Sequence, residues 1–468
     1  MSDWFQKSLE EIASALRHGE ISAQRLWEAA LSNHAHSMKS LGSFQVWNPD
    51  AAQCQARAAD AAFEAGIDAG PMQGIPISVK DLFGISHYPT FAGSPRELPR
   101  SWSREGPVIA EMRRQLAVIA GKTHTVEFAF SGLGANPHYP TPRNPWDSTQ
   151  HRVPGGSSSG AGVSLCTGTA LVALGTDTAG SIRIPASMTG NVGMKTSFGR
   201  WSTDGIVPLS PSLDSVGFLT RTVEDAIFVF EALDQRLAAP KAEYTPHYAD
   251  PKAIRIGICE GLLWTECSPG IAECVLAAID QLSAHGARRT SLKLPEIEQV
   301  LAIFNQGGLA AVELQHFLKT ELPEWLPLLD PKIRQRMEHA ATLTACEYLE
   351  RRALFAKLSA KMPEKLQAVD VLLTPTVAVT APTMVEIEQL EHYRENNLKS
   401  LRNTSIVNCL SLCALSLPVG LDAKGIPVGL QLIAPHGQDR TLLAIGRVFE
   451  ECLGTSRERL GEPPLRLH

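Results

Sequence analysis

The hydrophobic positions at the start of the chain recur every three or four residues, a spacing typical of helices. Leu9, Ile12 and Leu16 share one face of a first predicted helix. A second helix is predicted to begin at Ser22, where Ile21 and Leu26 occupy the N′ and N4 positions of a hydrophobic staple. We therefore expect residues 1–65 to form helices that pack on a core.

Further along the chain, short apolar runs and alternating apolar positions predict strands. These are expected at 74–80, 116–122, 171–174, 254–259, 369–373, 415–419 and 428–433. Helical spacing predicts a small-residue helix after residue 161, helices beginning near Thr222 and Ile271, a long helical stretch to about Leu366, and a final helix at 442–452. Strands that alternate with helices indicate a continuous α/β core.

The best internal boundary is the polar, proline-containing segment 234–253, which is predicted to be a linker. It separates a core region, residues 66–233, from a variable and mostly helical insertion, residues 234–366. Residues 367–468 are expected to return to the core sheet, because strand patterns reappear there.

The composition of the 468 residues is that of an ordinary soluble globular protein, with 44% hydrophobic and 20% charged residues. The net charge is −6 and the basic residues are scattered, which argues against a nucleic-acid-binding surface. The nine cysteines include no Cys-x-x-Cys pair, and the fourteen histidines form no cluster at zinc spacing. We therefore expect reduced thiols, no metal and no cofactor.

The start of the chain carries acidic residues and lacks the apolar region of a secretory signal. No run approaches the roughly 18 apolar residues of a membrane-spanning helix. A cytoplasmic protein without membrane contact is therefore expected.

Two loops rich in serine and glycine carry the candidate chemistry. They are GGSSSG at 155–160 and DTAGS at 177–181. Glycine lets a backbone turn tightly and approach a ligand closely. The segment between the loops consists of small and apolar residues, which predicts close packing that brings Ser157 and Ser181 to one place.

Three interpretations of these loops compete. The string GSSSG matches G-x-S-x-G, which would make Ser158 a nucleophile with His436 as its base, but that motif must follow an apolar strand and residues 149–154 are polar. A flexible linker is the second interpretation, although linkers are not embedded between apolar strands. The third interpretation joins Lys80 to both loops. A lysine that burial keeps neutral can act as a base, and Ser157 can relay the proton between Lys80 and Ser181.

The segment LAVIAGKT at 116–123 superficially matches a phosphate-binding loop. Leu116 stands where the first glycine of that motif belongs, so the backbone cradle is missing. Nucleotide binding is therefore not expected there.

Six segments together resemble the amidase signature family, and the chain is identified as a member of it. They are GIPISVKD (74–81), PGGSSSG (154–160), ALGTDTAGSIRIPA (173–186), SLDSVGFLTRTVEDA (212–226), DVLLTPT (370–376), and LSLPVG followed by IPVGLQLIAP (415–435). They keep the family's order and span most of the chain. The resemblance implies an α/β fold with a single large mixed β-sheet core flanked by helices, and a helical insertion.

The resemblance also implies a role for each site residue. Lys80 is the general base, Ser157 is the bridging serine with a cis peptide bond, and Ser181 is the nucleophile that forms the acyl-enzyme. The implied oxyanion hole consists of the backbone N–H groups of Thr178, Ala179, Gly180 and Ser181, and the implied loop supports are Ser158, Asp177 and Arg183. The family most often has glycine at the positions of Ala179 and Ser159. If the Ala179 position required a positive φ, alanine would strain the loop by about 1 kcal/mol or more.

The function expected from this resemblance is an amidohydrolase that cleaves a C–N bond of a small-molecule carboxamide or carbamoyl compound. One alternative is the glutaminase (transamidase) subunit of a tRNA-dependent amidotransferase, although residues 341–366 look more like free-standing amidases. A non-catalytic binding module on the same scaffold is the alternative of another class. A homodimer is a candidate assembly, since homodimers are common among relatives. The insertion is expected to wall the substrate pocket, with candidate lining residues Trp264, Phe304, His316 and Trp325.

Overall fold

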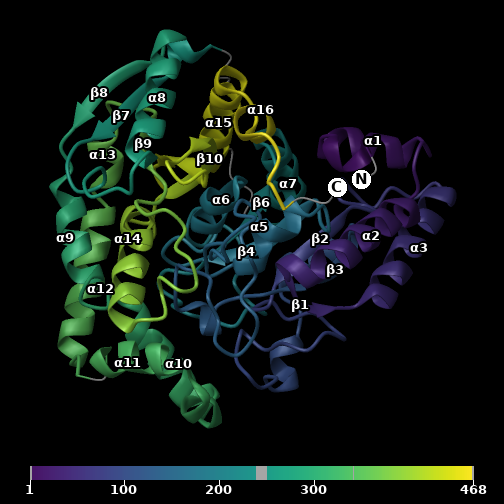
Figure 1. Cartoon of the computed structure of the whole chain (residues 1–468), viewed down its shortest axis with the longest axis horizontal. Helices are drawn as coiled ribbons and strands as arrows, with labels where there is room; N and C mark the ends of the chain where they lie inside the picture. Colours follow the sequence, from purple (N-terminus) through teal and green to yellow (C-terminus); the bar gives the residue numbers. More distant parts are fainter. Residues whose placement is uncertain (1–2, 239–249, 341, 466–468) are drawn as a thin grey trace.

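The fold is built on one large mixed β-sheet. The structure, a computed structural model, describes residues 3–238, 250–340 and 342–465. In these residues eleven strands form a single sheet. Helices pack on this sheet, as Figure 1 shows. The predicted α/β class with a single mixed sheet is therefore confirmed.

The elements follow one another along the whole chain. The strands are β1 (Phe44–Trp47), β2 (Pro76–Lys80), β3 (Val118–Thr123), β4 (Val172–Asp177), β5 (Val192–Lys195), β6 (Ser215–Thr220), β7 (Arg255–Cys259), β8 (Arg288–Leu292), β9 (Val371–Pro375), β10 (Cys413–Leu421) and β11 (Pro427–Ala434). The helices are α1 (Leu9–Arg17), α2 (Ala23–Leu41), α3 (Pro49–Glu64), α4 (Pro107–Arg114), α5 (Ser159–Cys166), α6 (Arg183–Thr189), α7 (Val223–Leu237), α8 (Ile271–Ala284), α9 (Pro295–Phe304), α10 (Ala310–Glu321), α11 (Pro331–Ala340), α12 (Ala345–Ser359), α13 (Met362–Lys365), α14 (Leu390–Cys409), α15 (Asp439–Leu453) and α16 (Ser456–Leu460). Short 3-10 helices lie at Asp3–Gln6, Arg100–Ser103, Glu127–Ala129, Pro251–Ala253 and Pro323–Leu328.

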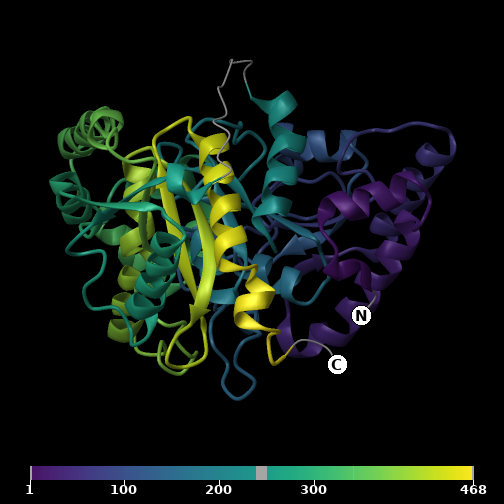
Figure 2. The same ribbon diagram turned by 90° about the horizontal axis from the view of Figure 1, so that it is seen from above.

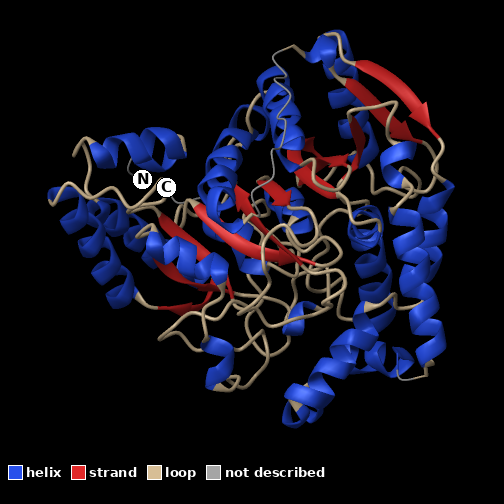
Figure 3. Cartoon of the chain, turned by 180° about the vertical axis from the view of Figure 1, so that it is seen from behind, coloured by secondary structure: helices blue, strands red, loops and turns tan. Residues whose placement is uncertain are grey.

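The strand order is β1-β3-β2-β4-β6-β5-β10-β11-β9-β7-β8. Strands β3, β2 and β4 are parallel, as are β9, β7 and β8, and the strands between these two sets pair antiparallel. The C-terminal strands β10 and β11 therefore lie in the interior of the sheet and not at its edge. Figure 2 shows these two strands in yellow. In Figure 3 helices cover both faces of the strands, so the central strands are buried on both sides.

Most predicted elements are present, with ends that differ by a few residues. Strand β2 is buried along its whole length and places Lys80 at its end. Ser22 caps α2 by accepting a hydrogen bond from the Arg25 N–H, and Thr222 caps α7 in the same way. The local signals for these elements agree with their tertiary packing, and this agreement explains why they could be predicted.

Strand β8 corrects the prediction of a continuous helical stretch between Gly286 and Leu366. Four of its five residues are exposed, because it lies at the edge of the sheet with β7 as its one neighbour in the described part of the chain. An edge strand can keep a polar sequence such as RRTSL, which lacks the apolar alternation used to predict strands.

The predicted linker 234–253 begins later than expected. Helix α7 continues to Leu237, because Asp234 is held by Arg200, by Arg440 and by the indole N–H of Trp201. Residues 239–249 of that linker lie outside the described residues. In the described ranges no helix is both long and apolar enough to cross a membrane.

Candidate active site

Lys80 and Ser157 form the buried centre of the site. Lys80 is fully buried at the end of β2, and its Nζ donates to Ser157 Oγ at 2.7 Å and to Thr176 Oγ1 at 2.9 Å. The peptide bond between Gly156 and Ser157 is cis. The sequence places these residues together because β2 pairs with β4, whose end carries Thr176, and the first serine loop lies over that end.

The second serine loop packs against the first. Ser181 lies between β4 and α6, and its carbonyl accepts a hydrogen bond from the Ser158 N–H at 3.3 Å. Ser181 lines a cavity of about 530 Å³, whereas Lys80 and Ser157 lie behind it with no exposed surface. The structure thus brings the three predicted catalytic residues into one region.

Burial sets the protonation of Lys80. It lowers the pKa of Lys80 to about 7, although the negative charges of Asp177 and Asp214 oppose this shift. A substantial fraction of Lys80 is therefore neutral near pH 7, and a neutral amine can accept a proton from the adjacent Ser157 hydroxyl.

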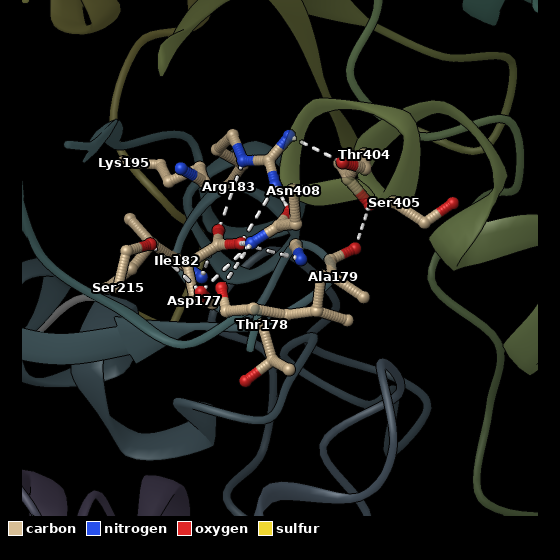
Figure 4. Close-up of polar contacts among 12 residues, drawn as sticks. Asp177, Thr178, Ala179, Ile182, Arg183, Lys195, Ser215, Thr404, Ser405 and Asn408 are labelled. Carbon is tan, nitrogen blue, oxygen red and sulfur yellow. Dashed lines mark hydrogen bonds and ion pairs between the residues drawn. The ribbon is translucent and has the colours of Figure 1, made fainter. Parts of the chain in front are cut away.

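A buried ion pair holds the loop that carries Ser181 (Figure 4). Asp177 accepts from Arg183 at 2.8 and 3.0 Å, from Asn408 at 3.0 Å and from the backbone N–H groups of Gly180 and Ile182. Burial alone would raise the pKa of Asp177, but Arg183 holds that pKa at about 2. Both members of the pair are fully buried, so a charged network anchors the loop in addition to the apolar packing of Ile182.

Replacing Arg183 with methionine is expected to lower the free energy of unfolding by about 3–5 kcal/mol, because Asp177 would stay buried without its cation. Urea unfolding followed by tryptophan fluorescence measures the effect. The matched control is Arg289→Met, which breaks an exposed pair with Asp280 and should cost no more than about 1 kcal/mol. Equal losses in the two variants would contradict this account of the loop.

The backbone N–H groups of the predicted oxyanion loop are not all equivalent. The Gly180 N–H already donates to Asp177 Oδ1 at 2.8 Å. The N–H groups of Thr178, Ala179 and Ser181 have no hydrogen-bond partner within the described ranges. Gly180 has a φ of +135°, whereas Ala179 does not have a positive φ, so alanine causes no backbone strain at its position.

Two alternative sites were considered from the sequence: a nucleophile at Ser158 with His436 as its base, and a phosphate loop that ends near Lys122. Ser158 Oγ has no hydrogen-bond partner in the described part of the chain, and His436 is exposed in the turn after β11. Lys122, at the end of the segment that superficially matches a phosphate loop, is buried 2.8 Å from Asp81. Its charge is therefore already paired inside the core.

The cavity wall combines the core with the insertion. Phe304, one of the four predicted lining residues, lies in this wall, while His316 lines a neighbouring cavity of about 970 Å³. Trp264 and Trp325 line neither of these two cavities, and Trp325 is buried in the main hydrophobic core. Searched over the described residues, His, Cys, Asp and Glu side chains form no group of three placed to hold a metal ion.

Several residues of the network were not identified from the sequence. Thr176 and Asp214 fall inside quoted motifs, so their positions were available although no role was assigned to them. Asp214 accepts from Thr178 Oγ1 at 2.5 Å, and burial raises its pKa to about 6. Asn408 and Thr404 come from α14, and no sequence signal linked this helix to the serine loops.

Comparison with known proteins shows the family of the chain. A family model described as Amidase matches residues 25–443. The chain belongs to the amidase family. This amidase-family chain is 46% identical over 461 residues to 2-amino-5-chloromuconic acid deaminase of Comamonas testosteroni, with 98% of each protein covered. It is 30% identical to a glutamyl-tRNA(Gln) amidotransferase subunit of Maridesulfovibrio salexigens, covering 97% of this chain and 98% of that one. A solved amidase structure superposes with a TM-score of 0.83 at 30% identity, covering 96% of this chain and 100% of the other. The chain is therefore a hydrolase that cleaves carbon–nitrogen bonds.

Proposed function

We propose that this amidase-family hydrolase cleaves a C–N bond of a small-molecule carboxamide or carbamoyl compound through an acyl-enzyme on Ser181. The observation that carries the proposal is the buried contact of 2.7 Å between Lys80 Nζ and Ser157 Oγ, next to the loop that carries Ser181. A serine becomes a nucleophile only when an adjacent base accepts its proton, and neutral Lys80 is that base.

In the proposed first step, Ser181 Oγ attacks the carbonyl carbon of the substrate. The Ser181 proton passes to Ser157 Oγ while the Ser157 proton passes to neutral Lys80 Nζ, so Lys80 becomes an ammonium. The new C–O bond pushes the carbonyl electron pair onto oxygen. The tetrahedral intermediate then collapses, the C–N bond breaks, and the leaving nitrogen takes the proton back through Ser157.

In the second half of the proposed cycle, water attacks the acyl ester of Ser181. Lys80, neutral again, accepts the proton of the water through Ser157. Collapse of this second intermediate releases the carboxylic acid and returns the proton to Ser181 Oγ. The net reaction consumes one water and one C–N bond and yields an acid and an amine or ammonia.

The negative oxygen of both intermediates needs hydrogen-bond donors that are free before the substrate binds. Backbone N–H groups of Thr178, Ala179 and Ser181 supply them in this proposal, whereas the Gly180 N–H stays with Asp177. Each such donor is typically worth about 3 to 4 kcal/mol in the transition state.

The relatives widen the set of substrates that we propose to test. One relative is named as a deaminase of 2-amino-5-chloromuconic acid, so ammonia is the first product to assay. The similarity to an amidotransferase subunit favours a second candidate function, release of ammonia from glutamine within a larger complex.

The purified chain alone should release ammonia from at least one class in a panel of aliphatic, aromatic and carbamoyl amides, glutamine and 2-amino-5-chloromuconic acid. Turnover without partner subunits supports the autonomous hydrolase. Turnover of glutamine alone, raised by stoichiometric partners that co-purify, would favour the amidotransferase. A chain that turns over nothing and is not labelled at Ser181 by an alkyl fluorophosphonate would instead be a binding module.

A further inference from the structure

The cavity beside Ser181 is cationic. In the described part of the chain, three arginines and no aspartate or glutamate line it. The arginines are Arg336 on α11, Arg351 on α12 and Arg394 on α14. A cavity of about 530 Å³ with this charge distribution is suited to a small anion.

Arg336 lies against the cavity wall and stacks on an aromatic ring there. Its guanidinium stacks over the Phe130 ring at 4.0 Å from the centroid, and it donates to the Phe130 carbonyl. Arg336 forms no ion pair with any residue that the structure describes. Stacking on an aromatic face keeps the planar guanidinium fixed, so its remaining N–H groups are ready for a planar ligand group.

Arg394 and Arg351 differ in what they already bind. Arg394 is close enough to Arg336 to lower the pKa of Arg336 further, and the Arg394 side chain forms neither an ion pair nor a hydrogen bond within the described ranges. Arg351 donates to the backbone carbonyls of Gln306 and Gly308, and these bonds hold the 304–308 turn against α12. Arg336 and Arg394 therefore have more N–H groups left for a ligand than Arg351 has.

The other polar side chains of the described cavity wall supply no negative charge that could pair with the arginines. Asn397 Oδ1 accepts from Ser131 Oγ and from the Gly132 N–H, and burial raises the pKa of the Tyr393 hydroxyl, which keeps it neutral. Two like charges in a partly buried space repel each other, and a bound anion that pairs with both relieves that cost. A carboxylate fits the planar fork of arginine in two parallel hydrogen bonds.

We propose that the substrate of this site carries a carboxylate away from its scissile C–N bond, that Arg336 and Arg394 bind this carboxylate, and that no cationic group lies next to it. This inference rests on the proposed function, because it takes Ser181 as the reacting end of the cavity. Arg336 and Arg394 are specificity-determining residues in this scheme, and they take no part in proton transfer.

The charge pattern also separates glutarate-like molecules from glutamate-like ones. Glutamine and glutamate carry an ammonium beside the α-carboxylate, and the described wall offers that ammonium three guanidinium groups and no acid. A desolvated cation without a partner is strongly disfavoured. The site should therefore accept glutaramate, which is glutamine without its α-amino group, and discriminate against glutamine.

The test measures how well small molecules protect Ser181 from labelling by a neutral alkyl fluorophosphonate, followed by mass spectrometry of the full chain. Glutarate should protect at least about tenfold better than either glutamate or 1,5-pentanediol, since hydrogen bonds between charged groups are typically worth 10- to 100-fold or so in affinity. Arg336→Met and Arg394→Met should each weaken protection by glutarate about 10- to 100-fold, relative to the labelling that the same variant shows without ligand. Arg336→Lys should recover part of the protection, because it restores the charge without the fork.

The matched control is Arg334→Met on the same helix, since Arg334 is exposed and donates to the Pro327 carbonyl outside the cavity. Protection by glutarate should be unchanged in that variant. Equal protection by glutarate and 1,5-pentanediol, or unchanged protection in both arginine variants at an unchanged melting temperature, would overturn the inference. If one variant unfolds, the other decides, because the two arginines lie on different helices.

Failure of the proposed function has a different signature. A native chain that is not labelled at Ser181 contradicts the nucleophile, whatever the arginines bind. Calorimetric titration of that native chain with glutarate and with 1,5-pentanediol would then decide the carboxylate site by itself. Binding of glutarate that is lost in Arg336→Met supports the site, and absence of binding overturns it.

Discussion

Replacing Ser181 with alanine is expected to lower ammonia release by about 10⁴-fold or more, because loss of the nucleophile removes the acyl-enzyme route altogether. The variant should also resist labelling by an alkyl fluorophosphonate. The residual rate reflects only substrate binding and the oxyanion donors. The measurement is kcat for the best substrate of the ammonia panel, together with the intact mass after exposure to the probe.

Ser159→Ala is the matched control for this result. Ser159 belongs to the neighbouring serine loop, and its Oγ has no hydrogen-bond partner in the residues that the structure describes. Its removal should change kcat by less than about tenfold, since a side chain without a hydrogen bond loses little on truncation. A Ser181→Ala variant that kept the native rate at a native melting temperature would show that another group attacks the substrate.

Replacing Lys80 with methionine is expected to lower kcat/KM by about 10²- to 10⁴-fold, the usual contribution of a general base. The native enzyme should also show a characteristic pH dependence. The neutral amine is the active form and the pKa of Lys80 is about 7, so kcat/KM should fall about tenfold per pH unit below 7 and level off above it. Rates measured from pH 5 to 9 test both statements.

A second buried group titrates close to this range and must be separated from Lys80. Burial raises the pKa of Asp214 to about 6. The negative charge of Asp214 also holds up the pKa of Lys80, so Asp214→Asn should move the ascending limb to lower pH without removing it. Loss of the limb in Asp214→Asn, or its persistence in Lys80→Met, would assign the titration to a group other than Lys80.

The catalytic candidates could be predicted because each stands in a short segment with a strong local pattern. Lys80 ends a buried alternating strand, and Ser157 and Ser181 lie in glycine-rich loops on either side of small residues. The resemblance of these segments to a family then joined residues that are far apart in the sequence. Their spatial proximity followed from the pairing of β2 with β4, which a single sequence does not specify.

The supporting residues could not be predicted for a physical reason. Helix α14 buries asparagine, threonine and serine side chains at positions where an isolated amphipathic helix would carry apolar ones. Asn408 and Thr404 are buried because they hydrogen-bond to the Ser181 loop. From the sequence alone, polar residues in a helix are expected to face solvent, because their buried hydrogen-bond partners are not known.

Strands with a weak sequence pattern were also difficult to predict. Strand β5 has four residues, of which one is glycine and one is lysine, and it was not predicted. It is nevertheless completely buried between β6 and β10. Lys195 satisfies its charge there by donating to the carbonyls of Thr196 and Leu412, contacts that cannot be inferred from the strand itself.

In the proposed scheme, helix α14 serves both substrate recognition and support of the Ser181 loop. Arg394 and Leu398 in its first half line the cavity, whereas Thr404 and Asn408 in its second half hold the Ser181 loop. Ten residues of α-helix span about 15 Å, so positions 394 and 404 do not contact each other directly. A directed-evolution library can therefore randomise positions 394 and 398 to change substrate range while fixing 403–408, and its members should keep the native catalytic machinery.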